Sequence, residues 1–146
     1  MVRGAQAGLG GAGVRLTAAF VDTNVLIRHF TGDPPRLARR ATRFLAGAER
    51  LLLTDVVFAE CVYVLESFYE VAPERVAELM RAAIALPAME VADEPILTRA
   101  LEVYERHGLH FADAYLVASA EVHSPTAIAS FDRGLDRLGT VARVEP

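Results

Sequence analysis

Two acidic residues follow short apolar runs in places where a carboxylate could do chemistry. Asp22 comes directly after the run Ala18–Val21, and Asp132 comes shortly after the run 126–129. Runs of this length are typical of strands buried on both faces. Because open α/β sheets bind ligands at the carboxyl ends of their strands, both acids are candidate functional groups. For Asp22 a plainer interpretation stays open, since Asp is also a good N-cap for the helix that follows.

Two further acids stand alone within apolar helical segments. Glu60 is the only charged residue between Asp55 and Glu66, and Asp113 is the only carboxylate between 109 and 118. The apolar residues around Glu60 cover nearly all sides of a helix, which predicts a buried helix. An ionised carboxylate is rarely buried unless it is paired or binds a metal. Both residues are therefore candidate metal ligands.

Together these four acids indicate a specific chemistry. If the fold brings them close, each negative charge raises the pKa of the others and destabilises the fold unless a cation neutralises them. A set of oxygen ligands favours Mg²⁺ or Mn²⁺ over zinc. Such an ion keeps bound water, which it can activate, and it can also hold a phosphate group. The pattern therefore predicts in-line hydrolysis of a phosphodiester bond.

The segments that must position these acids alternate between strand and helix patterns. We expect strands at 18–21, 51–53, 88–91, 126–129 and 141–144, helices at 25–30, 36–47, 56–69, 73–85, 96–107 and 109–118, and a helical turn at 133–138. This alternation predicts an α/β fold with a mainly parallel sheet and helices on both faces. Cys61, Tyr63 and Met80 are expected in the core.

Length and composition indicate one domain. The chain has 146 residues, of which 53% are hydrophobic, enough to bury a core. We place the folded domain at 18–146 and interpret the Gly- and Ala-rich residues 1–17 as a flexible tail. No apolar run reaches the roughly 18 residues of a membrane span. The single cysteine, Cys61, excludes an internal disulfide and a Cys-rich zinc site, so we expect a cytoplasmic protein outside the membrane.

The basic residues could supply a phosphate-binding surface. The net charge of −4 repels nucleic acid in bulk, but all 15 basic residues are arginines, whose planar side chains suit phosphate. Arg36, Arg39, Arg40 and Arg43 repeat with helical spacing and so share one helix face. A merely solvated face is the alternative. With Arg28, these residues are candidates for RNA binding.

Four segments together resemble a known family. They are VDTNVLIRHFTGD, VVFAECVYVL with Glu60, HFADAYLVA with Asp113, and ASFDRGLDRL with Asp132. They resemble the PIN domain, in particular the VapC-type toxins of type II toxin–antitoxin systems. The resemblance implies a PIN-like α/β/α sandwich with a sheet of about five strands over 18–146. It also implies a Mg²⁺- or Mn²⁺-dependent endoribonuclease with Asp22, Glu60, Asp113 and Asp132 as its acidic quartet, supported by Thr23, Asn24 and Ser130.

The resemblance further implies partners, and it has one departure. Such proteins commonly form homodimers and are inhibited by a small VapB-type antitoxin that inserts a segment into the active-site groove. The helices after Pro73 are a candidate dimer face. Many relatives carry a second Asp at the position where this chain has Gly134. Whether Asp136 replaces it is left open.

Three other functions compete with this interpretation. A catalytically silent PIN-like module would keep the fold and bind RNA or a protein without cutting. A phosphatase with an aspartyl nucleophile would resemble the pattern D-x-D, but Asn24 stands two residues after Asp22. A purely structural domain would have to pair its isolated acids with arginines. Metal binding separates the nuclease from these alternatives.

Overall fold

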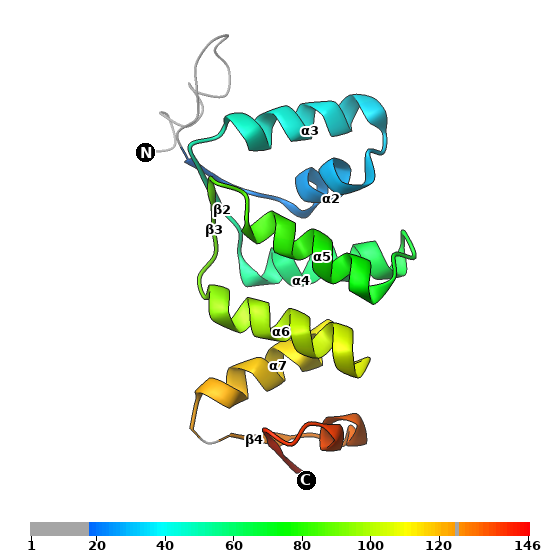
Figure 1. Cartoon of the computed structure of the whole chain (residues 1–146), viewed down its shortest axis with the longest axis vertical. Helices are drawn as coiled ribbons and strands as arrows, with labels where there is room; N and C mark the ends of the chain where they lie inside the picture. Colours follow the sequence, from blue (N-terminus) through cyan, green and yellow to red (C-terminus); the bar gives the residue numbers. More distant parts are fainter. Residues whose placement is uncertain (1–17, 125) are drawn as a thin grey trace. The chain divides into compact units, whose positions relative to one another are not determined.

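The computed structural model describes residues 18–124 and 126–146, so the predicted tail 1–17 and Pro125 lie outside the described residues. The elements, in chain order, are β1 (Ala18–Phe20), α2 (Thr23–Thr31), α3 (Pro35–Gly47), β2 (Arg50–Leu52), α4 (Asp55–Ser67), α5 (Pro73–Ile84), β3 (Met89–Glu90), α6 (Glu94–His107), α7 (Phe111–Val122), β4 (Ala127–Ala129), the 3₁₀ turn η1 (Arg133–Arg137) and β5 (Ala142–Val144) (Figure 1). Every expected element is present, most within one to three residues of its predicted bounds.

These elements form two compact units. The first, the N-terminal unit, contains residues 18–61 and 82–92, and the second, the C-terminal unit, contains 62–81 and 93–146. Helices α4 and α5 contribute residues to both. Each unit is described by itself below.

The N-terminal unit is built on a parallel sheet in the order β1-β2-β3. Leu51 of β2 is in register with Ala19 on one side and Met89 on the other. Helices α2 and α3 lie side by side (Figure 1). Helix α2 ends at Gly32, whose φ of 72° is the left-handed conformation that glycine adopts without strain. Fully buried apolar residues of this unit include Leu26, Leu51, Phe58 and Cys61.

The C-terminal unit is dominated by the packing of α6 against α7. Helix α6 begins at the cap Asp93, whose side chain accepts a 3.1 Å hydrogen bond from the Ile96 amide, and it ends at Gly108 in the left-handed conformation. The rings of Tyr104 and Phe111 meet edge to face, 6.1 Å apart. In the same unit β4 pairs with β5, again in parallel.

The α/β class and the parallel pairing are thus confirmed. The described residues contain five strands, as expected, with β1, β2 and β3 paired in the N-terminal unit and β4 and β5 paired in the C-terminal unit. The strands are only two or three residues long, so each makes few backbone hydrogen bonds to a neighbour. None of the described helices is long and apolar enough to span a membrane.

Helix α4 differs from its prediction. Cys61 is fully buried, as expected, and so is Met80 of α5. However, Val56 is 78% exposed and Tyr63 is 69% exposed, with Glu60 also exposed between them. The predictions of a helix buried on all sides and of Tyr63 in the core are therefore wrong. Folded surfaces keep many apolar side chains, so an apolar sequence cannot by itself mark which helix face is buried.

Candidate active site

Asp22 stands at the junction of β1 and α2. It occupies the N-cap position of α2 with extended backbone angles (φ −86°, ψ 155°), yet its side chain makes no capping hydrogen bond. The residue is exposed, whereas the next residue, Thr23, is buried. Capping therefore does not account for this carboxylate, which stays available for another ligand.

Thr23 connects this junction to α4. Its Oγ1 donates a 2.9 Å hydrogen bond to Oε2 of Glu60. Burial raises the pKa of the Cys61 thiol to about 12, and the negative charges of Glu60 and Asp22 contribute further. Both carboxylates therefore lie near the same thiol. The N-terminal unit brings together two of the four predicted acids and one predicted supporting residue.

Most of the predicted RNA-binding arginines border one hollow of the same unit. Arg28, Arg40 and Arg43 line a hollow of about 620 Å³ between α2 and α3, and Asn24, two residues after Asp22, lines it as well. Phe44, which is 37% exposed, forms part of its apolar surface. Arg36 is exposed but is not among the described residues that line this hollow.

The other predicted acids belong to the C-terminal unit. Asp113 is half-buried in the first turn of α7. Asp132 is exposed and caps η1, where its Oδ1 accepts a 2.8 Å hydrogen bond from the Gly134 amide. Oγ of Ser130 accepts a 3.0 Å hydrogen bond from the Asp132 amide. Ser130 therefore holds the backbone at Asp132, and its predicted supporting role at a metal site stays a prediction.

Arg143, a residue that the sequence analysis did not single out, also holds the segment from Ser130 to Asp136. The Arg143 side chain is 11% exposed and donates to the Ser130 carbonyl at 3.0 Å, to Asp136 Oδ1 at 2.8 Å and to Glu145 Oε2 at 2.9 Å. Arg143 also lowers the pKa of Asp136. The available signal was an arginine within the apolar strand 141–144. Asp136 is engaged in this ion pair, and whether it replaces the missing acid stays an open question of the sequence analysis.

Gly134 leaves room for the Asp132 carboxylate. A Cβ at this position would lie 3.0 Å from Asp132 Oδ1 and 3.5 Å from Leu109 Cδ2. A distance of 3.0 Å is too short for an undisturbed contact. A Cβ here would therefore crowd the Asp132 carboxylate, whose Oδ1 accepts from the Gly134 amide.

The donor groups fit a hard cation in their chemistry. All four predicted ligands are carboxylates, the donors that Mg²⁺ and Mn²⁺ prefer. Two lie in the N-terminal unit and two in the C-terminal unit. Within the described parts of the chain, no three His, Cys, Asp or Glu side chains form a group that could hold a metal. The four-carboxylate site therefore stays a prediction.

Comparison with known families identifies the fold. A family model described as "PIN domain" matches residues 19–141. The chain belongs to the PIN domain family. PIN domains are generally nucleases that use divalent metal ions, so the family indicates a nuclease-type function with RNA as substrate. The match includes Asp22, Glu60, Asp113 and Asp132. No curated protein matches the chain significantly.

Proposed function

We propose that this PIN domain is a metal-dependent endoribonuclease that hydrolyses phosphodiester bonds within RNA. The observation that carries the proposal is Asp22. It follows a parallel strand, makes no capping hydrogen bond, and lies near a second acid, Glu60, that Thr23 holds through a 2.9 Å hydrogen bond. The carboxyl end of a parallel strand is where α/β proteins place their ligands.

In this proposal the four carboxylates have different roles. Asp22, Asp113 and Asp132 would hold a Mg²⁺ or Mn²⁺ ion directly or through water, and Glu60 would complete the shell or orient the attacking water. When bound, the ion supplies a Lewis acid that polarises the phosphate and lowers the pKa of water. Thr23 positions Glu60, while Ser130 and Gly134 position Asp132 through its backbone amide and its carboxylate.

The hollow lined by Arg28, Arg40 and Arg43 provides local positive charge in a chain whose net charge is −4. Helix α3 carries four arginines and no acidic residue. Like charges three or four residues apart on a helix destabilise it by about 0.2–0.5 kcal/mol per pair. A phosphate backbone that binds Arg28, Arg40 and Arg43 removes this repulsion and lies beside Asn24, two residues after Asp22. In this proposal Arg36, which is exposed on the same helix, contacts the RNA at a neighbouring phosphate.

We further propose that the enzyme is a VapC-type toxin, with a VapB-type antitoxin and a second copy of the chain as protein partners. Exposed apolar side chains on α4 support a protein partner, because Val56 and Tyr63 are 78% and 69% exposed. The helices after Pro73 remain the proposed dimer face.

The decisive experiment compares the wild-type protein with the Asp22→Asn variant. Purified proteins are incubated with a mixed pool of structured RNAs in the presence of Mg²⁺, Mn²⁺ or EDTA. We expect cleavage to need metal and to fall more than about a hundredfold in the variant. The free energy of unfolding should change by less than about 0.5 kcal/mol, because the Asp22 side chain makes no cap hydrogen bond.

Asp33→Asn is the matched control. It removes the same charge from an exposed residue of the same unit and should cleave like the wild type. Undiminished cleavage by Asp22→Asn would reject the site. Absence of both cleavage and calorimetric metal binding would favour the alternative, a silent module that binds RNA or protein.

A further inference from the structure

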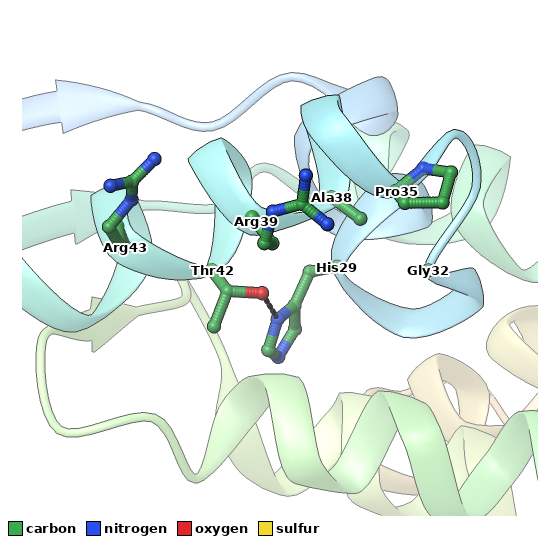
Figure 2. A pocket seen from close by; sticks show the side chains of 7 residues that line it. All are labelled: His29, Gly32, Pro35, Ala38, Arg39, Thr42 and Arg43. Carbon is green, nitrogen blue, oxygen red and sulfur yellow. Dashed lines mark hydrogen bonds between the residues drawn. The ribbon is translucent and has the colours of Figure 1, made fainter.

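A second hollow lies on the other side of α3 from the one lined by Arg28 and Arg40. Its volume is about 510 Å³, and its lining includes His29, Arg39, Thr42 and Arg43, with Pro35 and Ala38 as apolar surface (Figure 2). None of the described residues that line it is acidic. The predicted single arginine face of α3 is thus split, with Arg39 facing this hollow, Arg40 facing the other, and Arg43 lining both.

Among the described residues, the arginines of this hollow form no ion pair with a carboxylate. The ion pairs of the described residues involve Arg50, Arg75, Arg81, Arg99 and Arg143, and none of them includes an arginine of α3. Arg39 and Arg43 therefore carry exposed positive charge that no described carboxylate neutralises. An exposed pair of guanidinium groups without acids is suited to an anion from outside the chain.

The other polar groups of the hollow form an ordered arrangement. His29 Nδ1 and Thr42 Oγ1 are joined by a 2.8 Å hydrogen bond, which connects the end of α2 to α3. Figure 2 shows the His29 ring directed at Thr42, with the guanidinium group of Arg39 above both in this view. Because Nδ1 is engaged, the second ring nitrogen is left for a ligand. Burial lowers the pKa of His29, which favours the neutral ring.

We propose that this hollow binds one nucleotide of single-stranded RNA outside the cleavage site, with the phosphate held by Arg39 and Arg43. This inference rests on the proposed ribonuclease function. Arg43 lines both hollows, so a strand can cross α3 at Arg43 while its phosphates stay next to arginines. The hollow is large enough for a nucleoside phosphate rather than a bare ion.

An unpaired strand fits this surface better than a duplex. Single-strand binding combines positive charge along the backbone with apolar or aromatic surfaces against which bases lie. The exposed Pro35 offers such a surface in this hollow, and the 37% exposed Phe44 offers one in the neighbouring hollow. In an RNA duplex the base faces are stacked on each other and cannot reach these surfaces.

The test measures binding without cleavage. Full-length protein in EDTA is titrated into a short, fluorescein-labelled single-stranded RNA of mixed sequence, and Kd is obtained from anisotropy between about 50 and 200 mM salt. Arg39→Gln should weaken binding about tenfold and flatten the slope of log K against log salt by about 0.7. Thr42→Val should weaken binding about threefold without changing the slope.

The control is Arg106→Gln, which removes the same charge from an exposed residue of α6 and should bind like the wild type. An Arg39→Gln variant that matches this control, or a wild-type protein that binds no RNA, would overturn the proposal. The proposal would also be overturned if free adenosine monophosphate displaced the labelled RNA as well as unlabelled RNA does. The same holds if an acidic peptide bound through Arg39 and RNA did not. Because binding is measured in EDTA, failure of the Asp22 cleavage experiment leaves this result unaffected, and the two proposals can fail separately.

Discussion

The hydrogen bond from Thr23 to Glu60 offers a direct test of how the candidate site is held. Thr23→Val removes the hydroxyl but keeps the shape of a buried side chain and nearly the same helix propensity. A buried hydrogen bond to a charged acceptor contributes about 1.5–3 kcal/mol. Glu60 is exposed, so water can replace the lost donor. We therefore expect the free energy of unfolding to fall by about 1 kcal/mol, which lowers Tm by roughly 2–4 °C in a chain of this size.

A double-mutant cycle measures this contact alone. Thr23→Val, Glu60→Ala and the double variant are unfolded in urea, and we expect a coupling free energy of about 1 kcal/mol. Thr98→Val is the control, because Thr98 is half-buried on α6 and no hydrogen bond of the described residues joins it to Glu60. Additivity of the Thr23 and Glu60 changes within about 0.3 kcal/mol would refute the contact.

The same variant separates positioning from folding. If Thr23 positions Glu60 for catalysis, Thr23→Val should lower kcat about tenfold at saturating Mg²⁺ while KM changes little. Thr98→Val should leave both constants unchanged. A kcat that follows only the loss of folded protein would show that the contact is structural.

Two further predictions concern Cys61 and Gly134. Because the folded pKa of Cys61 is raised to about 12, its contribution to stability is complete below the ordinary thiol value of about 8.5. That contribution falls by up to about 1.4 kcal/mol per pH unit as pH rises above it. Urea unfolding at pH 8 and pH 10 should therefore show a steeper loss for the wild type than for Cys61→Ala, and equal losses would contradict this cause. Gly134→Ala places a Cβ 3.0 Å from Asp132 Oδ1, whereas a Cβ at Gly139 meets nothing within 4 Å. We expect the first change to cost about 1 kcal/mol of stability and to slow cleavage, and Gly139→Ala to do neither.

The local structure of this chain was largely predictable. Short apolar runs and helical spacing predicted the strands and helices, and helix starts and ends were predicted from Gly32, Pro35, Asp93 and Gly108. The structure has these elements close to the expected bounds. These signals are local, because a cap or a left-handed glycine acts on its own turn of helix. The parallel pairing of strands was also predictable, since helices join successive strands.

Exposure was less predictable. Val56 and Tyr63 of α4 were assigned to the interior on their hydrophobicity, and both are exposed. Leu65 and Phe58 of the same helix are fully buried. Nothing in an apolar segment distinguishes these residues, because burial depends on which neighbouring elements cover each face.

The sequence by itself determined the candidate chemistry: two acids after strands, two acids alone in apolar helices, an arginine-rich helix and a single cysteine, in an α/β order of elements. Only the tertiary structure decided how these groups are used. It joined Thr23 to Glu60, engaged Asp136 with Arg143, and divided the arginines of α3 between two hollows. The physical reason is range: residue types and spacing act within a few residues, whereas hydrogen bonds and ion pairs between groups far apart in the chain exist only after packing has placed them together.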